Sequence, residues 1–437
     1  MLTAGTEVEV EGHGPVTVGR CLGEGGQGAV FEAHDRARRA FALKWYRTGA
    51  APADHADNLA ELVERGPPSE RFLWPLGLAR IKGRDEFGYL MRLRPSGYVD
   101  LHQYLSGTDD QGRPLEVSFA ALTTLSFQLA RSFLKLHALG LCYRDINRGN
   151  LFFAPDRGDA LICDNDNVGI DGTPGPVYGT LGYMAPEVVL LLEGPNTPGA
   201  SWPSARTDLH SLAVALFEIL MIAHPLDGRK SEAGPSDIRW QIEHLGRDPV
   251  FIFDPRNDRN PPLDDTPVRY WRAYPTFIRR LFIQAFTAGL RDPGERVRES
   301  AWASAMLRMR DSILSCGSCG RTIFYDWDDP RRGCVRCGSP CYRPLMLEIG
   351  RHRIALGPKT KVWTDHFASD HDATAPVAEM TAHPHDPRRW GLRNLTDKAW
   401  AATDPDGRGQ QVPPGRTIET RAGTQIHFGP RDGRVTQ

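Results

Sequence analysis

The sequence predicts an α+β protein whose strands and helices are segregated along the chain. Apolar and polar residues alternate over residues 6–46, with glycines between the runs, which is typical of an antiparallel sheet. Helical periodicity follows between residues 119 and 314, and short β-like runs broken by Gly and Pro return after residue 341. Five of the eight cysteines crowd between these last two regions. The chain therefore reads as a small β-rich part, a helical part, a cysteine-bearing segment and a β-rich tail.

The composition of the 437 residues excludes several classes of protein. Lys and Arg number 53 against 54 Asp and Glu, so the chain lacks the basic excess of a protein that binds nucleic acid or membranes through charge alone. The start of the chain is acidic and has no apolar leader. The most apolar stretch, residues 209–226, contains His210, Glu218 and His224, which favours a buried helix over a membrane span. We expect a cytoplasmic protein.

The first predicted hairpin carries the pattern G-x-G-x-x-G. Such a hairpin lets backbone N–H groups face phosphate oxygens, and its position between two strands argues against a Rossmann-type dinucleotide site. Lys44 follows the last glycine by sixteen residues. A lone lysine after an apolar run usually extends to solvent, but at this distance from a glycine-rich hairpin it can reach phosphates. The residues expected around the phosphates are Gly23, Gly25, Gly26, Gly28 and Val30.

Several helices are expected further along the chain. Residues 53–65 form a short helix that a Gly-Pro-Pro turn closes. Residues 119–140 form a long amphipathic helix, whereas residues 209–222 are apolar nearly all round and predict a central buried helix. Helical patterns return at residues 276–290 and 299–314.

The loop after the long amphipathic helix reads Y-R-D-I-N-R-G-N-L and contains Asp145 and Asn150. It resembles the H-R-D-L-x-x-x-x-N loop of eukaryotic-like protein kinases. In such a loop the carboxylate orients the substrate hydroxyl and accepts its proton, while the amide oxygen binds Mg²⁺. The resemblance implies that Asp145 is the base and Asn150 a magnesium ligand.

Later motifs follow in the order of the same family. Residues 179–187 read G-T-L-G-Y-M-A-P-E, Asp208 opens the buried helix, and D-P-x-x-R ends at Arg296, which is expected to pair with Glu187. With these motifs the chain is similar to the Hanks-type serine/threonine kinases of bacteria. The resemblance implies a bilobal kinase fold with an N-lobe over residues 1–91 and a C-lobe over 92–312.

The resemblance also implies an ATP site with Mg²⁺. Lys44 would hold the phosphates, Met91 would stand at the back of the adenine pocket, and Leu93 at the hinge between the lobes. Asp164 stands where the family has D-F-G and is the expected magnesium ligand, although the Phe and the Gly are absent. Asp166 remains an alternative ligand or a partner for a second ion.

Two positions of this site depart from the family pattern or leave a choice open. The glutamate that should hold Lys44 is Glu61 by distance along the chain, which we prefer, or Asn58 by local pattern. Asn147 stands where serine/threonine kinases have a lysine that contacts the transferred phosphate, and the neighbouring Arg148 could substitute for it.

The arginine before the catalytic aspartate, Arg144, suggests an electrostatic switch. In the family such an arginine often meets a phosphate on the activation segment. The candidates are Thr173, Tyr178 and Thr180, of which Thr180 is expected instead to bond Asp145.

Two C-x-x-C turns separated by fourteen residues predict a structural zinc ribbon over residues 313–344. All four positions would be filled by protein, which leaves none open for chemistry. Nearby arginines are offset by Asp326, Asp328 and Asp329, so nucleic acid is not an expected partner. The expected ligands are Cys316, Cys319, Cys334 and Cys337.

Residues 345–437 predict a small all-β, sandwich-like domain. The runs around Trp390 and residues 412–429 distantly resemble the late strands of forkhead-associated domains, without that family's phosphothreonine-reading residues, which favours partner docking. The domain order looks similar to kinases of bacterial three-component modules, which implies signalling beside a von Willebrand A-type protein and a PP2C-type phosphatase.

We therefore expect an ATP-dependent kinase that phosphorylates Ser or Thr of protein substrates, and plausibly itself. The alternative is a pseudokinase scaffold that binds nucleotide and docks partners through its zinc ribbon and β-domain. A small-molecule kinase is disfavoured because such enzymes generally lack the A-P-E segment and the D-P-x-x-R motif.

Overall fold

The computed structural model describes residues 2–51, 54–232, 234–235, 237–330, 332–367 and 375–437. The chain forms two compact units, of which the first comprises Met1–Pro267 and Leu281–Ala303. The second comprises Val268–Arg280 and Ser304–Gln437. The units do not follow the four predicted segments, because residues 268–280 and 304–312 group with the cysteine segment and the tail.

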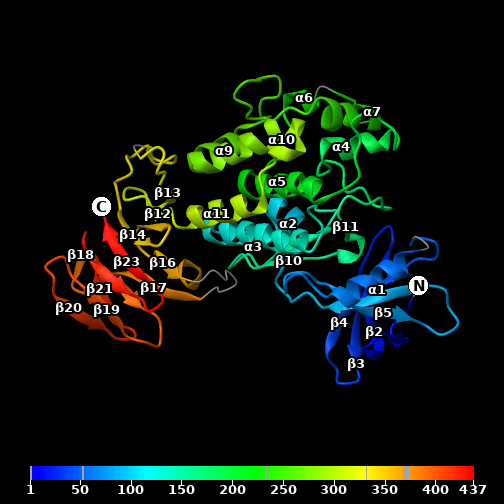
Figure 1. The fold of residues 1–437 in the computed structure, drawn as a ribbon, viewed down its shortest axis with the longest axis horizontal. Coiled ribbons are helices and arrows are strands. Elements are labelled where there is room, and N and C mark those ends of the chain that lie inside the picture. The colour runs from blue at the N-terminus through cyan, green and yellow to red at the C-terminus, as the bar shows by residue number, and fades with distance from the viewer. Residues whose placement is uncertain (1, 52–53, 233, 236, 331, 368–374) are drawn as a thin grey trace. The chain divides into compact units, whose positions relative to one another are not determined.

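The first unit begins with a closed antiparallel barrel in the order β1-β2-β3-β4-β6-β5 (Figure 1). Val8 and Val10 of β1 and Val16 and Val18 of β2 are buried while the residues between them are exposed, which is the alternation seen in the sequence. Beside the barrel, helix α1 (His55–Arg65) buries Leu59 and Leu62. The strands are β1 (Glu7–Val10), β2 (Gly14–Glu24), β3 (Gly28–Asp35), β4 (Ala40–Tyr46), β5 (Pro75–Arg80) and β6 (Phe87–Arg92).

A buried helix, α5, is the centre of the helical part of this unit. Its residues from Thr207 to Met221 are all buried, as the nearly continuous apolar sequence predicts. A capping box between Ser204 and Thr207 fixes its N-terminus, and Ser118 caps the adjoining α3. The helices are α2 (Leu101–Ser106), α3 (Phe119–Ala138), α4 (Pro186–Val189), α5 (Ala205–Met221), α6 (Arg229–Glu232), α7 (Ile238–Ile242) and α10 (Ala288–Arg291), while α8 (Asp265–Ala273), α9 (Thr276–Ala285) and α11 (Glu299–Arg310) have residues in both units.

Short strand pairs bring two polar loops together. Residues 143–150 and 163–168 connect these strands, so pairing of the strands fixes where both loops begin and end. The order of one small sheet is β10-β9-β7, and β8 pairs with β11. The strands are β7 (Val99–Asp100), β8 (Leu141–Cys142), β9 (Leu151–Phe153), β10 (Ala160–Ile162) and β11 (Gly169–Ile170).

In the second unit, a hairpin of β12 (Ile313–Ser315) and β13 (Thr322–Phe324) precedes Asp326. The Asp326 carboxylate is buried and accepts hydrogen bonds from the backbone N–H and the hydroxyl of Thr276, at 2.7 and 2.8 Å. Asp326 therefore caps the start of α9, and its Oδ2 also lies 3.7 Å from Nη1 of Arg332, so it offsets one of the nearby arginines as well.

The tail consists of a six-stranded and a four-stranded antiparallel sheet, in the orders β15-β14-β23-β22-β19-β20 and β16-β17-β18-β21. Both sheets contribute to one apolar core, with Leu347 and Ile426 from the first and Met380 and Leu392 from the second. The strands are β14 (Leu345–Ile349), β15 (His352–Leu356), β16 (Lys361–Trp363), β17 (Pro376–His383), β18 (Asp386–Asn394), β19 (Trp400–Thr403), β20 (Gly409–Val412), β21 (Thr417–Glu419), β22 (Gln425–His427) and β23 (Asp432–Thr436).

Within the described part of the chain, no helix combines the length and the apolar character that crossing a bilayer requires. The apolar stretch around residues 209–226 lies instead in and directly after α5.

A buried ion pair joins two segments of the first unit. Nη1 and Nη2 of Arg296 each donate to one carboxylate oxygen of Glu187, both at 2.7 Å. The two side chains are 2% and 13% exposed. This is the Arg296–Glu187 pair that the sequence motifs predict, in the bidentate geometry that makes such pairs strong.

We predict that Arg296→Met lowers the free energy of unfolding by about 3 kcal/mol, because Glu187 would be left as a largely buried, unpaired carboxylate. The control is Arg247→Met, whose guanidinium also pairs with a glutamate, Glu193, but is 46% exposed. Exposed pairs contribute little, so no resolvable change is expected there. Urea unfolding followed by circular dichroism measures both variants, and equal losses would contradict the prediction.

Candidate active site and cysteine cluster

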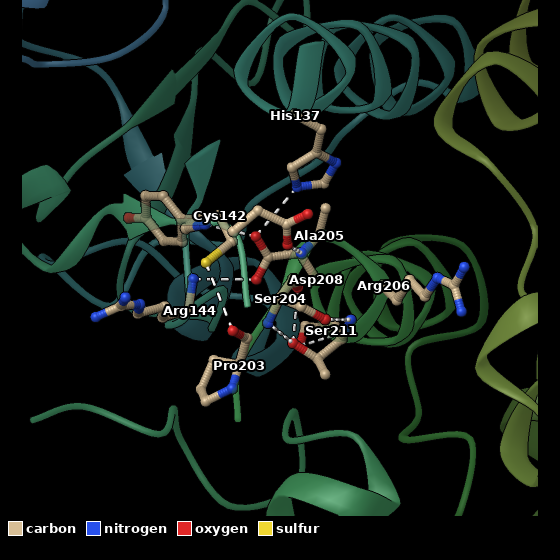
Figure 2. Close-up of polar contacts among 12 residues, drawn as sticks. His137, Cys142, Arg144, Pro203, Ser204, Ala205, Arg206, Asp208 and Ser211 are labelled. Atoms are coloured by element: carbon tan, nitrogen blue, oxygen red, sulfur yellow. Dashed lines mark hydrogen bonds and ion pairs between the residues drawn. The ribbon is translucent and has the colours of Figure 1, made fainter. Parts of the chain in front are cut away.

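The loop that carries Asp145 is held by a buried carboxylate on α5, that of Asp208 (Figure 2). Asp208 Oδ1 accepts the backbone N–H of Arg144 at 3.0 Å, and Oδ2 accepts the N–H of Tyr143. Arg144 has φ 74°, in the left-handed region that non-glycine residues seldom adopt. Asp208 therefore stabilises an unfavourable backbone conformation directly before Asp145.

His137 of α3 lies between Asp208 and Glu299. Its Nε2 is 3.1 Å from Asp208 Oδ2, and its Nδ1 contacts a carboxylate oxygen of Glu299. Burial alone would lower the pKa of His137, but hydrogen bonds and charge from both carboxylates outweigh it and raise the pKa to about 9. The imidazole is thus a cation at neutral pH. No sequence pattern predicts this triad, since His137 and Glu299 are 162 residues apart and lie in no motif.

Asp145 is oriented by three neighbours. Its Oδ1 accepts the hydroxyl of Thr180 at 2.7 Å, the contact expected for Thr180. Asn150 Nδ2 donates to the Asp145 carbonyl at 2.9 Å, so the amide oxygen of Asn150 is left as the acceptor for a cation. Asn147 Nδ2 donates to the same carbonyl at 3.2 Å and to Thr180 Oγ1 at 3.1 Å. Asn147 therefore braces the loop, but it brings no positive charge.

Lys44 on β4 meets the second polar loop. Its Nζ contacts Asp164 Oδ1, lies 2.8 Å from Asp166 Oδ2, and lies 3.4 Å from Oε1 of Gln27 in the glycine-rich turn. Burial would lower the pKa of Lys44, but the charges of Asp166 and Asp164 outweigh it and raise the pKa. Lys44 is therefore a buried cation between the glycine-rich turn and the 163–168 loop.

The two aspartates differ in exposure and in partners. The side chain of Asp164 is 35% exposed, whereas that of Asp166 is 0% exposed. Burial and the neighbouring Asp166 charge raise the pKa of Asp164, while Lys44 lowers the pKa of Asp166 against the effect of burial. Asp164 is thus the one that can face a ligand, as the sequence prefers.

The expected contact between Glu61 and Lys44 is absent, which corrects the prediction. The Glu61 carboxylate is 47% exposed and pairs with Arg65 one helical turn away, at 2.7 Å. The alternative, Asn58, donates instead to the carbonyl of Val168 at 3.4 Å. The prediction of Glu61 used only distance along the chain, which could not reveal that the buried Asp166 forms an ion pair with Lys44.

The glycine-rich turn and the apolar residues expected around ATP lie next to Lys44. Gly23, Gly25 and Gly26 have open space where a side chain would be, whereas a Cβ on Gly28 would come within 2.1 Å of the Trp45 carbonyl oxygen. Only glycine fits that last position. Val30, Met91 and Leu93 belong to one apolar cluster together with Ala42 and Leu161.

Arg144 also reaches the activation segment. Its Nη2 donates to the hydroxyl and the carbonyl of Thr173, at 3.1 and 3.3 Å. The guanidinium lies between Gly169 and Gly175, where added Cβ atoms would come within 2.3 and 1.9 Å of it. Arg144 is only 8% exposed, so a buried cation faces one of the predicted phosphorylation candidates.

Arg148 does not point its charge at the transfer site. Its guanidinium forms a bidentate pair with Glu218 of α5, whose side chain is fully buried and also accepts the hydroxyl of Tyr183. The prediction that Arg148 could replace the missing loop lysine is therefore not supported by its contacts.

The four cysteines of the C-x-x-C turns come together. Cys316 Sγ lies 3.7 Å from Cys337 Sγ, and Cys319 Sγ lies 3.8 Å from Cys334 Sγ. Four thiolates at ~2.3 Å around a tetrahedral zinc ion are separated by ~3.8 Å, so the donor set and its spacing fit zinc. Hydrogen bonds from the Ser339 side chain and backbone lower the pKa of Cys337 to about 6, whereas burial and the three neighbouring thiols raise the pKa of Cys319 to about 11.

In a second cluster, which consists of Asp311, His352 and His366, the contact between Asp311 and His366 is explained without a metal. His366 Nδ1 accepts the backbone N–H of Trp363 at 2.9 Å, so the proton is on Nε2, which lies 2.9 Å from Asp311 Oδ1. A nitrogen that donates to a carboxylate has no lone pair for an ion. This contact is therefore a structural one.

Comparison with known proteins identifies the part of the chain that contains both polar loops. Residues 96–264, which include Asp145, Asn150, Asp164 and Asp208, match the protein kinase domain. Protein kinase YegI of Escherichia coli (strain K12) is 26% identical over 313 residues, 69% of this chain and 45% of the relative. Serine/threonine-protein kinase PknG of Mycolicibacterium smegmatis is 26% identical over 144 residues, 33% of this chain and 17% of the relative. Residues 96–264 are thus similar to a protein kinase domain, and the chain spans less than half the length of these curated relatives.

We predict that the contribution of the His137 triad to the free energy of unfolding is lost in alkaline solution. The pKa of His137 in the folded protein, about 9, lies above the ordinary histidine value of 6.5. The contribution, up to roughly 3 kcal/mol, is therefore complete below pH 6.5 and lost as the pH rises through 9. Thermal unfolding of the wild type and of His137→Gln between pH 6 and 10 measures it. The difference between the two should shrink over this window, and a constant difference would contradict the triad's charge assignment.

Proposed function

We propose that the protein is an ATP-dependent serine/threonine protein kinase. The observation that carries the proposal is the convergence of Lys44 and Asp164, 120 residues apart, beside the loop of Asp145 and Asn150. The matched kinase domain and the kinase names of the relatives agree with it. Serine or threonine as the acceptor rests on the resemblance and on the name of the PknG relative.

In the proposed reaction, Asp145 accepts the proton of the substrate hydroxyl as its oxygen bonds to the γ-phosphorus of ATP. The bond between that phosphorus and the β–γ bridging oxygen breaks, which leaves ADP. Lys44 and the glycine-rich turn hold the phosphates. Asp164 and Asn150 would hold Mg²⁺, for which carboxylate and amide oxygens are suitable ligands, and the ion would neutralise phosphate charge.

The missing loop lysine favours a slow kinase and keeps the scaffold alternative open. With Asn147 in place of the lysine and Arg148 paired to Glu218, the loop offers no free cation of its own to the transferred phosphate. Preorganised charge at that place is worth several kcal/mol in enzymes generally. A pseudokinase scaffold would bind ATP at Lys44 without transferring phosphate.

The activation segment is proposed to be autophosphorylated at Thr173. A phosphate there would meet the buried guanidinium of Arg144, which already bonds the Thr173 hydroxyl. A charge-assisted contact of this kind orders a segment more strongly than the present hydroxyl contact.

The remaining parts are proposed to dock partners. Zinc in the cysteine cluster would be structural, because all four positions are protein thiolates. The two-sheet tail would be a degenerate forkhead-associated-like docking domain, and the proposed partners are a von Willebrand A-type protein and a PP2C-type phosphatase in cytoplasmic bacterial signalling. These assignments rest on the resemblance.

Asp145→Ala is expected to lower phosphate transfer about 10³-fold while ATP binding is retained, because the base is lost and the nucleotide contacts are not. Purified protein incubated with γ-labelled ATP and Mg²⁺ and mapped by mass spectrometry measures this, with label expected on Thr173. The control, Asp156→Ala, removes a carboxylate that is 70% exposed and should behave as wild type. ATP binding without any label in the wild type would favour the scaffold.

Cys337→Ser is expected to abolish binding of one zinc ion per chain and to lower the melting temperature. The metal supplies much of the folding energy of so small a segment. Cys21→Ser, at an exposed cysteine far from the cluster in sequence, is the control and should retain zinc. Elemental analysis of the purified protein before and after a chelator decides, and a metal-free, equally stable wild type would refute the assignment.

A further inference from the structure

Lys44 is held by a residue that the family motif does not have. Among the described residues, every carboxylate within ion-pair distance of its Nζ belongs to the 163–168 loop, namely Asp164 and Asp166. Helix α1, which was expected to supply a glutamate, turns Glu61 to solvent and to Arg65. Lys44 therefore pairs with a buried carboxylate, that of Asp166, which comes from the 163–168 loop and not from α1.

Asp166 is enclosed by donors on all sides. Oδ2 accepts from Lys44 Nζ at 2.8 Å and from the hydroxyl of Tyr46. Oδ1 accepts the hydroxyl of Tyr89 at 3.3 Å, and His55 Nε2 lies 3.6 Å from Oδ2 and 2.8 Å from the Tyr46 hydroxyl. Because its side chain is 0% exposed and both oxygens are in use, Asp166 is poorly suited to bind an ion that arrives with ATP.

The surroundings are built for this one carboxylate. Lys44 and Tyr46 lie two residues apart on β4 and so project to the same face of the strand, and Tyr89 lies opposite Lys44 on β6. His55, in the first turn of α1, joins this group through its contact with the Tyr46 hydroxyl. Four groups from three elements thus converge on Asp166, in an arrangement that a lone surface aspartate would not need.

We propose that Asp166 is the positioning residue of Lys44 and takes the role expected of Glu61, leaving Asp164 as the magnesium ligand. This inference rests on the proposed kinase function for its catalytic consequence. It also implies that the position of Lys44 depends on α1 through His55 and Tyr46, and not through an acidic side chain of that helix.

Phosphate transfer separates the two aspartates. Asp166→Asn is expected to lower kcat about 100-fold and to leave the Mg²⁺ concentration for half-maximal activity within twofold. Asp164→Asn should raise that concentration at least tenfold. The matched control, Glu61→Gln, removes the charge that the family pattern would require and should behave as wild type. A large loss of kcat in Glu61→Gln, or a shifted Mg²⁺ dependence in Asp166→Asn, would overturn the proposal.

A second measurement does not depend on activity. Trace acetylation with acetic anhydride, quantified at Lys44 by mass spectrometry on the full chain, should be several-fold faster in Asp166→Asn than in wild type and unchanged in Glu61→Gln. Tyr46→Phe keeps the carboxylate and removes one donor, so it should fold and show a smaller increase. If all proteins lack kinase activity but this order of labelling holds, the proposed function fails, whereas the positioning of Lys44 by Asp166 is supported. Equal labelling of Lys44 in all four proteins would refute the proposal that Asp166 positions this lysine.

Discussion

The site depends on the buried carboxylate of Asp208, which accepts the backbone N–H groups of two consecutive residues before Asp145. Those N–H groups lie in a loop, where neither a helix nor a strand partner is at hand, and Arg144 has φ 74°. The carboxylate therefore satisfies two backbone donors beside a residue whose φ is unfavourable for a side chain other than glycine. The carboxylate belongs to α5, whose residues from Thr207 to Met221 are all buried. Tyr143 links this loop to the 163–168 loop, because its hydroxyl donates to the carbonyl of Cys163.

A common arrangement recurs around this support: a buried acid meets a cation from a distant segment. Asp208 has His137, Glu187 has Arg296, and Glu218 has Arg148. Buried pairs of this kind add little net stability over apolar packing, since desolvation offsets most of the attraction, but each is costly to break. Their value is specificity, because a misplaced segment would leave an unpaired charge inside the protein.

The parts of the site that follow local rules could be predicted from the sequence. The alternation over residues 6–46, the apolar sequence of α5 and the spacing of Asp145 and Asn150 are local patterns, and the expected contacts of Thr180 and Arg296 follow from motifs. The charge partners of Lys44 and His137 come from segments 120 and 162 residues away, which no periodicity or spacing connects. Alternation did hold one clue, since it sets Tyr46 on the same face as Lys44. The grouping of residues 268–280 with the second unit involves a similar contact, since Asp326 accepts the backbone N–H of Thr276 at the start of α9 from 50 residues away.

The departures from the kinase pattern are connected by charge. Where the pattern has a glycine two residues after the metal-binding aspartate, this chain has Asp166, and a new carboxylate in a closed space needs a cation and several donors. Lys44 supplies the cation, which leaves Glu61 without a function inside and free to face solvent. Near the proposed transfer site the 143–150 loop offers no unpaired cation, because Asn147 is neutral, Arg148 is paired with Glu218 and Arg144 bonds Thr173. In the proposed kinase, Lys44 would be the principal side-chain cation left for the phosphates, so its placement would matter more than in a kinase with two such cations. A fixed, fully enclosed anion such as Asp166 is better suited to that demand than a glutamate on a helix at the surface.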